Sequence, residues 1–229
     1  MSLNYEGVLQ RLKEERVRNN LSQRQLSYQM RMMQSHYSKA ELGKKRFTYY
    51  EMQCLGSTDI DIQYVYTGVK STEKYKSFFI NCTFEEIICH VGILYSMITF
   101  FRQADSTGRW ERIYRRIEYM KYILVAGKEN DNILYSVRRL LGYTQQKMAG
   151  CLGVDVKKLR ELENGRILPD SEMIWRIYDL FHIPPSIILK DKKGFVCELC
   201  SLLEFIGKDA GEAAFNYLRT GHKCLGEIR

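Results

Sequence analysis

Charged side chains gather on one side of a short helix predicted to follow Asp155. They are Asp155, Lys157, Lys158, Arg160 and Glu161. The apolar residues of the same stretch fall on the opposite side, where they would face a small core shared with a preceding helix. Charged and polar side chains on an exposed helix can hydrogen-bond to DNA bases and phosphates. Whether these side chains can make such bonds depends on how the fold positions the helix.

The stretch from Tyr143 to Pro169 has the layout of two short helices joined by a tight turn. Thr144 can cap the first helix, Gln145–Leu152, by accepting a hydrogen bond from a free amide of the first turn. Gly153 can adopt the positive φ of the turn, and Asp155 can cap the second helix. A polar helix held by a partner across a glycine turn is the helix-turn-helix arrangement that places one helix in the DNA major groove.

The sequence between Ile133 and Leu189 resembles the lambda-repressor and Cro-like (Xre-type) helix-turn-helix regulators. The residues that carry the resemblance are Arg138, Thr144, Gln145, the run Glu163-Asn164-Gly165, Pro169 and the apolar ladder Ile174, Ile177, Phe181 and Ile183. The resemblance implies an all-α, five-helix domain that binds operator DNA, with family members acting as dimers.

The N-terminal part of the chain repeats this pattern at a constant offset of 122 residues (138 − 16 = 122 for the two arginines). The five matching residues are Arg16, Ser22, Gln23, Glu41 and Gly43. Such a constant offset indicates an internal repeat. The sequence therefore predicts a second five-helix domain, with helices at about 8–18, 23–30, 34–42, 49–56 and 62–66.

The first copy departs from the family pattern at three positions. Arg31 replaces the turn glycine, which costs roughly 1 kcal/mol if the turn needs a positive φ. Met33 replaces the cap of the recognition helix, at a further cost of about 1 kcal/mol, and Phe47 replaces the proline. A less regular turn is expected, with the fold kept by Leu26, Met30, Tyr37 and Met52.

Four segments are predicted along the chain, all of them helical. They are a first helix-turn-helix domain at 1–68, a helical connecting segment at 69–130, a second helix-turn-helix domain at 131–190 and C-terminal helices at 191–229. Thr83 and Glu86 form a capping box that opens a helix at about 84–103. Because this helix is apolar almost all round, we expect burial against several partners. Further helices are expected at about 109–125, 195–206 and 209–219, with the last residues loose.

The family resemblance assigns DNA contacts residue by residue. In the first copy, Gln23 would bond the DNA backbone. The recognition-helix residues Gln34, Ser35, Ser38 and Lys39 would face base edges, and Lys44, Lys45 and Arg46 would contact phosphates. Gln can bond adenine and Lys can bond guanine, so this set can read sequence. A solvated helix face in a domain that binds protein is the other interpretation.

In the second copy, the residues assigned to DNA are Gln145, Lys157, Lys158, Arg160, Asn164 and Arg166. Val156 offers only an apolar contact there, and Glu161 would repel phosphate unless it accepts from a cytosine amine. The second copy matches the family's fold pattern better, but its outer residues are less able to bond bases. The base contacts are therefore expected from the first copy.

No metal, cofactor or catalytic group is expected. Cys197 and Cys200 form a CxxC motif inside an apolar helix, but no second cysteine pair or HxxxH motif accompanies it. His182 and His222 look isolated, so buried structural thiols are favoured over zinc. Cys82, Cys89 and His90 receive the same interpretation. No glycine-rich phosphate loop or nucleophile–base pair occurs at a recognisable spacing, so the chain is not expected to be an enzyme.

The chain of 229 residues carries 35 Lys and Arg against 27 Asp and Glu, a net charge of +8 that favours a polyanionic partner. The 7 cysteines, with no signal peptide in front of them, predict reduced thiols in a bacterial cytoplasmic protein. The apolar run at 87–101 is short for a membrane span, so a buried helix is expected.

Three functions remain open from the sequence. The first is a sequence-specific transcriptional regulator, a repressor with double-stranded operator DNA and a second copy of the chain as partners. The second is a protein-interaction or antitoxin-type protein in which one or both helix-turn-helix domains bind protein. The third is a regulator that senses a ligand or peptide in a pocket of residues 70–130.

Overall fold

A computed structural model describes residues 4–70, 73–104, 108–126, 133–189 and 192–227. Within these ranges the chain forms helices and no strand, which confirms the predicted all-α class. The chain divides into two compact units, of which unit 1 joins Met1–Lys70 to Glu129–Gly194 and unit 2 joins Ser71–Lys128 to Phe195–Arg229. The four predicted segments thus combine in pairs. The boundaries near 130 and 190 lie outside the described residues.

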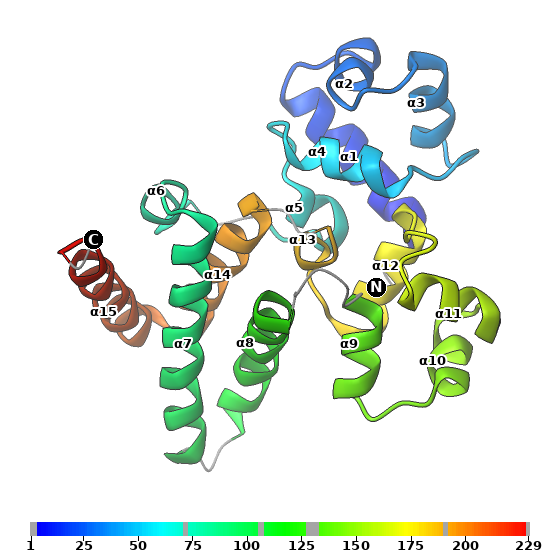
Figure 1. Ribbon diagram of the computed structural model, residues 1–229. Helices are drawn as coiled ribbons and strands as arrows, with labels where there is room; N and C mark the ends of the chain where they lie inside the picture. Colours follow the sequence, from blue (N-terminus) through cyan, green and yellow to red (C-terminus); the bar gives the residue numbers. More distant parts are fainter. Residues whose placement is uncertain (1–3, 71–72, 105–107, 127–132, 190–191, 228–229) are drawn as a thin grey trace. The chain divides into compact units, whose positions relative to one another are not determined.

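Unit 1 contains both copies of the repeat (Figure 1). The first copy comprises α1 (Tyr5–Arg18), α2 (Gln23–Gln29), α3 (Gln34–Glu41), α4 (Tyr49–Gly56) and α5 (Ile62–Thr67). The second comprises α9 (Ile133–Leu140), α10 (Gln145–Leu152), α11 (Val156–Glu163), α12 (Ser171–Phe181) and α13 (Pro185–Ile188). Helix α1 begins earlier than predicted because the Asn4 side chain caps it, accepting from the Gly7 amide at 2.9 Å.

The turn between α2 and α3 has the same form as the turn between α10 and α11. Arg31 has a φ of 55° and Gly153 has a φ of 64°. The next residue closes each turn, since the Met32 amide donates to the Ser27 carbonyl and the Val154 amide to the Ala149 carbonyl, both at 3.0 Å. The expectation of a less regular first turn is therefore wrong. Arginine adopts the left-handed conformation because the surrounding hydrogen bonds hold it there.

The predicted core of the first copy is confirmed. Leu26, Met30, Tyr37 and Met52 are all buried, with exposures of 0–1%. Met33 makes no side-chain cap at the start of α3, as expected from the lost cap residue. In the second copy, Asp155 caps α11 by accepting from the Lys158 amide at 2.7 Å.

The two copies are joined through Ser171 at the first position of α12. The Ser171 hydroxyl lies 2.5 Å from the Tyr5 hydroxyl and accepts from the Phe47 amide at 3.1 Å. The Ser171 amide in turn donates to the Phe47 carbonyl at 3.0 Å. Since proline has no amide hydrogen, the replacement of the family proline by Phe47 is what permits the bond to the hydroxyl.

The closing helices of the two copies, α5 and α13, also contact each other (Figure 1). Beside them, Tyr49 donates to the Ile188 carbonyl at 3.2 Å and Gln53 to the Leu189 carbonyl at 3.0 Å. Neither the pairing of α5 with α13 nor the Ser171 contacts were predicted. Together they make the two copies one unit, which presents two helix–turn–helix segments.

Unit 2 contains α6 (Lys76–Phe79), α7 (Phe84–Ala104), α8 (Arg109–Ala126), most of α14 (Lys192–Ile206) and α15 (Lys208–Glu227). The predicted capping box is present, with the Thr83 amide bonded to Glu86 at 2.7 Å and the Glu86 amide bonded to Thr83 at 3.2 Å. In α8, Ile113, Ile117 and Met120 are fully buried.

Helix α7 is not buried on all sides, contrary to expectation. Its buried residues form one stripe, Ile87, His90, Val91, Leu94 and Ile98, whereas Phe100 is 68% exposed. The helix is long and apolar enough to cross a membrane by length and composition, and 28% of its most apolar stretch is buried. A helix in the core of a protein can have the same length and composition, so this property does not show whether α7 lies in a membrane.

The C-terminal helix is also longer than predicted. It runs from Lys208 to Glu227 rather than ending near Arg219. Packing of its inner face explains the extension, since Ala214 and Leu218 are buried and the His222 ring stacks on His90. Tertiary packing of this kind outweighs the weak helix propensity of the late glycines.

Candidate nucleic-acid interface

A buried ion pair fixes the helix that follows the turn, α3 or α11, in each copy. In the first copy, Arg16 of α1 bonds Glu41 of α3 through two nitrogens, at 2.8 and 3.2 Å. In the second copy, Arg138 makes the same two contacts with Glu163, the longer at 3.2 Å. All four residues are at most 9% exposed. Bidentate pairing of this kind sets the angle between helices as well as their contact.

Each predicted backbone-contacting glutamine belongs to this buried network. Gln23 donates to Glu41 at 2.5 Å, and Gln145 donates to Glu163 at 2.9 Å. A glutamine amide has two N–H donors, so one remains for a phosphate. Their first role in the structure is to tie the start of α2 or α10 to the end of the following helix, a role that the sequence pattern alone did not reveal.

The network keeps Glu41 ionised. Burial opposes this by raising the pKa of Glu41, but hydrogen bonds from Arg16, Gln23 and Tyr37 outweigh burial and leave the pKa below its usual value. The same hydrogen bond from the arginine raises the pKa of Arg16. Burial and the Glu41 charge raise the pKa of Tyr37, whose hydroxyl donates to Glu41 at 3.0 Å. The second copy has Leu159 where the first has Tyr37.

The predicted base-reading residues of α3 lie on its surface. Gln34, Ser35 and Lys39 are exposed, and Ser38 is half-buried. Lys44 and Lys45, which follow the helix, are exposed as well. The exposed side of α3 thus carries an amide, hydroxyls and cations. The buried network contacts the opposite side of α3.

Arg46 is placed differently from the other predicted phosphate contacts. Its guanidinium forms an ion pair with Glu172 of the second copy and lies over the Tyr5 ring, 4.9 Å from the centroid. It also donates to the Gly43 carbonyl at 3.1 Å. The prediction that Arg46 serves DNA phosphates therefore competes with a role in joining the copies.

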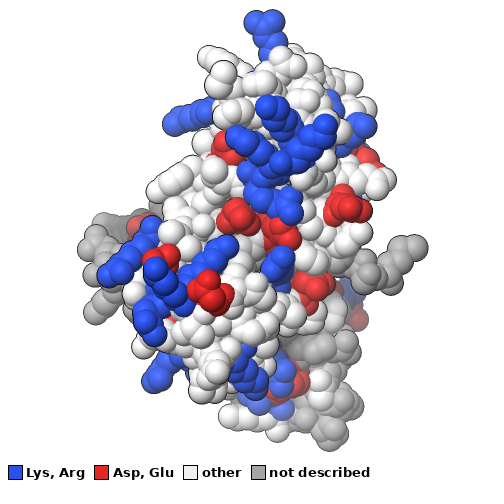
Figure 2. Space-filling view, turned by 90° about the vertical axis from the view of Figure 1, so that its right-hand side faces the viewer, with Lys and Arg blue, Asp and Glu red and all other residues white. Residues whose placement is uncertain are grey.

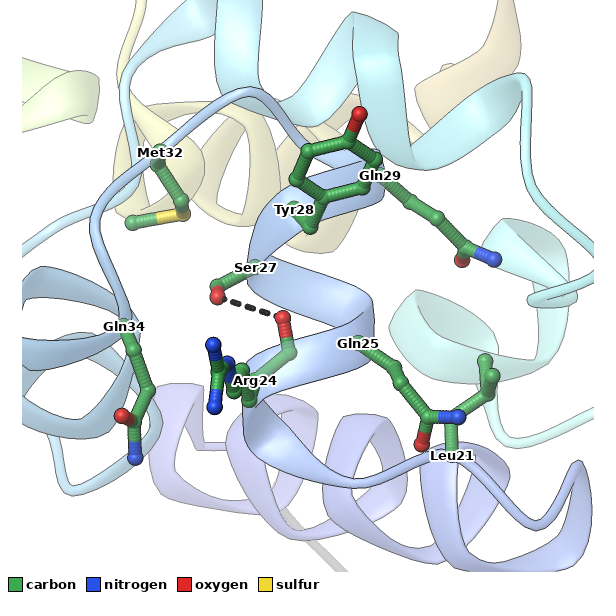
Figure 3. A pocket seen from close by; sticks show the side chains of 8 residues that line it. All are labelled: Leu21, Arg24, Gln25, Ser27, Tyr28, Gln29, Met32 and Gln34. Atoms are coloured by element: carbon green, nitrogen blue, oxygen red, sulfur yellow. Dashed lines mark hydrogen bonds between the residues drawn. The ribbon is translucent and has the colours of Figure 1, made fainter.

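An open hollow of about 490 Å³ lies between α2 and the start of α3 (Figure 3). Gln34 lines it together with Arg24, Gln25 and Tyr28 of α2. Tyr28 is 84% exposed, and Arg24 is exposed beside it. Sequence reasoning missed Arg24 and Tyr28. A signal was present, because both stand on the outer side of the helix that packs against the recognition helix.

Arg31 is a further exposed cation that sequence reasoning treated only as a replaced glycine, and it lines a second hollow with Tyr50 and Glu51 of α4. Its side chain is exposed on the turn that leads into α3. The left-handed backbone costs about 1 kcal/mol for a residue other than glycine.

The predicted contacts of the second copy are also on the surface. Lys157, Lys158, Arg160, Asn164 and Arg166 are all exposed. Val156 and Glu161 are half-buried among them. Figure 2 faces the side of the molecule on which α3 and α11 lie in Figure 1, and it shows Lys and Arg in separate groups with Asp and Glu between them. The positive charge is therefore discontinuous across the two copies.

The CxxC motif in α14 has the surroundings of a structural pair. Cys200 is fully buried, and burial raises the pKa of its thiol to about 12. Between the two cysteines, Glu198 is also buried and bonds Arg116 of α8 at 2.6 Å. A thiol that stays protonated is a poor nucleophile.

His222 is not isolated, contrary to the sequence-based interpretation. Its ring stacks on His90 with centroids 5.5 Å apart, and Cys82 Sγ lies 3.8 Å from His90 Nε2. The fold brings these three residues together from two distant parts of the chain. The aromatic rings of Phe78, Phe79 and Phe215 pack on one another beside this group. Phe78 and Phe79 also contact the His90 ring.

No protein-family model matches the chain, and no curated protein or solved structure is detectably similar to it. The likeness to the lambda-repressor and Cro-like regulators consequently rests on the residues and geometry described above.

Proposed function

We propose that this chain is a sequence-specific DNA-binding regulator of transcription, acting as a repressor by occupying an operator. The observation that supports this most is the repeated Arg–Glu–Gln network under an exposed polar helix. In both copies it holds the helix after the turn by its inner side and leaves the outer face to solvent. This is the arrangement that a helix needs to enter the DNA major groove.

The first copy supplies the base contacts in this proposal. Gln34 can bond adenine N6 and N7, and Lys39 can bond guanine O6 and N7. The exposed cations around them are Arg24, Arg31, Lys44 and Lys45. If these four each neutralise one phosphate, the logarithm of the binding constant falls with the logarithm of salt concentration with a slope of about −3.6.

The second copy serves mainly as a backbone anchor. Lys157, Lys158 and Arg160 supply positive charge, whereas Val156 and Glu161 restrict hydrogen bonding to bases. Because one chain already carries both copies in one unit, a single molecule presents two DNA-binding helices. A homodimer would present four. The cytoplasm of a bacterium is the compartment in which such a regulator acts.

Fluorescence anisotropy with DNA duplexes tests this proposal. The double variant Gln34→Ala/Lys39→Ala removes two base contacts worth about 1–3 kcal/mol each, so affinity for a preferred duplex should fall at least about 30-fold. The matched control is Gln10→Ala/Lys13→Ala, which removes the same residue types from exposed positions of α1. Equal affinity of wild type and both variants would exclude α3 as the reading helix.

A protein-interaction function is the second candidate, and exposed apolar side chains around α2 and α3 favour it. Tyr28, Met33 and Leu42 are 84%, 67% and 66% exposed. Exposed apolar groups in one neighbourhood suit a protein partner more than a phosphate backbone. Weak DNA binding with no preferred sequence, together with a partner lost on Tyr28→Ala, would favour this function.

A further inference from the structure

Unit 2 contains a group of three metal-ligating side chains that plays no part in the proposed DNA interface. Cys82 precedes α7, His90 lies on α7 and His222 lies on α15. One ligand atom from each lies within 4.8 Å of the other two. We propose that Cys82, His90 and His222 bind a Zn²⁺ ion that fastens α15 to α7.

The spacing of Cys82 and His90 suits a tetrahedral ion. Zn²⁺ binds cysteine sulfur at about 2.3 Å and histidine nitrogen at about 2.0–2.1 Å, so a tetrahedral angle places the two ligand atoms about 3.6 Å apart. Cys82 Sγ lies 3.8 Å from His90 Nε2. Only a small movement is needed to bring the pair to ligand distance.

One imidazole of the group has a buried nitrogen without a partner. His90 is fully buried and would bind through Nε2, the nitrogen beside Cys82 Sγ, and among the described residues the buried atom His222 Nδ1 has no hydrogen-bond partner. Buried polar atoms without partners are uncommon and call for an explanation such as a bound ion or water.

The chemistry of the three ligands favours zinc over Mg²⁺ and Ca²⁺, and aromatic rings surround the group. The aromatic rings of Phe78 and Phe79 lie 5.5 Å from the His90 ring, and Phe78 lies 5.3 Å from His222. One sulfur and two imidazole nitrogens suit Zn²⁺, whereas Mg²⁺ and Ca²⁺ prefer oxygen ligands. Three protein ligands leave the fourth position to water or an outside group. His222 is half-buried, which allows that exchange.

Cobalt substitution in the full chain, purified without an affinity tag and freed of metal, tests the site. Co²⁺ should bind with one ion per chain, showing the charge-transfer band of a cobalt–thiolate bond and the strong visible bands of tetrahedral cobalt. Zn²⁺ should displace it. Cys82→Ser should abolish the thiolate band, and His222→Gln should weaken binding by more than about 100-fold, since loss of even a supporting residue costs 10–100-fold.

Two controls remove the same residue types outside the group. Cys89→Ser changes an exposed cysteine on α7, and His36→Gln changes an exposed histidine on α3. Both should bind Co²⁺ like wild type. Circular dichroism shows whether Cys82→Ser folds; if it does not, His222→Gln carries the test. Absence of a thiolate band in wild type, its persistence in Cys82→Ser or its loss in Cys89→Ser would overturn the proposal.

Discussion

Removal of one hydroxyl at the junction of the two copies should destabilise the protein strongly. Ser171 is 1% exposed, and its hydroxyl serves both the Tyr5 hydroxyl at 2.5 Å and the Phe47 amide at 3.1 Å. Ser171→Ala leaves both groups without this partner. A buried polar group left unpaired costs about 1–3 kcal/mol. Because Tyr5 is 8% exposed and can reach water, we expect a loss of about 2–4 kcal/mol rather than the full sum.

Urea unfolding of wild type, Ser171→Ala, Tyr5→Phe and the double variant measures this loss and its origin. Tyr5→Phe removes only one of the partners, so it should cost about 1 kcal/mol. The double variant should lose less than the sum of the two single variants. Hydrogen exchange of the Phe47 amide should accelerate in Ser171→Ala. Ser35→Ala, at an exposed position of α3, is the control and should stay within about 0.5 kcal/mol. The same small effect for Ser171→Ala, with unchanged exchange at Phe47, would refute the reasoning.

Three further outcomes follow from the buried networks and the turns. Arg138→Met should cost about 3–5 kcal/mol in unfolding experiments, because Glu163 keeps its buried charge and loses its partner. Arg31 and Gly153 both have a positive φ, which suits glycine better than other residues. In thermal melting, Arg31→Gly should therefore stabilise the chain by up to about 1 kcal/mol, and Gly153→Ala should destabilise it by about as much. Glu41 has a lowered pKa in the folded state, so its contribution to stability is complete above its usual pKa of 4.5 and is lost as the pH falls through the lowered value. Denaturation between pH 7 and pH 3 should therefore show that the difference in unfolding free energy between wild type and Glu41→Gln becomes smaller as the pH falls.

The helices of unit 1 could be predicted closely from the sequence because their ends carry local signals. The predicted range Gln145–Leu152 is the observed α10, and Tyr49–Gly56 is the observed α4. Caps, turn residues and apolar spacing act within a few residues, so they can be read from the chain itself. The family resemblance put Gln34 and Lys39 on the outer face of their helix, and both are exposed.

The contacts between distant segments could not be predicted in this way. The pairing of Phe47 with Ser171 and the approach of His222 to His90 depend on how whole helices pack. The same holds for α7, whose apolar sequence indicated burial on all sides although packing covers one stripe. Composition describes what a helix tends to bury, whereas the partners that are present decide what is covered.

Selection of bound duplexes from a random DNA pool, followed by sequencing, tests the central claim most directly. The account predicts one enriched motif for the full chain. It also predicts binding that weakens steeply as salt rises, and loss of the motif in Gln34→Ala/Lys39→Ala but not in Gln10→Ala/Lys13→Ala. The spacing of any repeated half-site would show whether α3 alone or both α3 and α11 engage DNA. A bound pool with no enriched sequence, or a motif that persists in the α3 variant, would contradict the account.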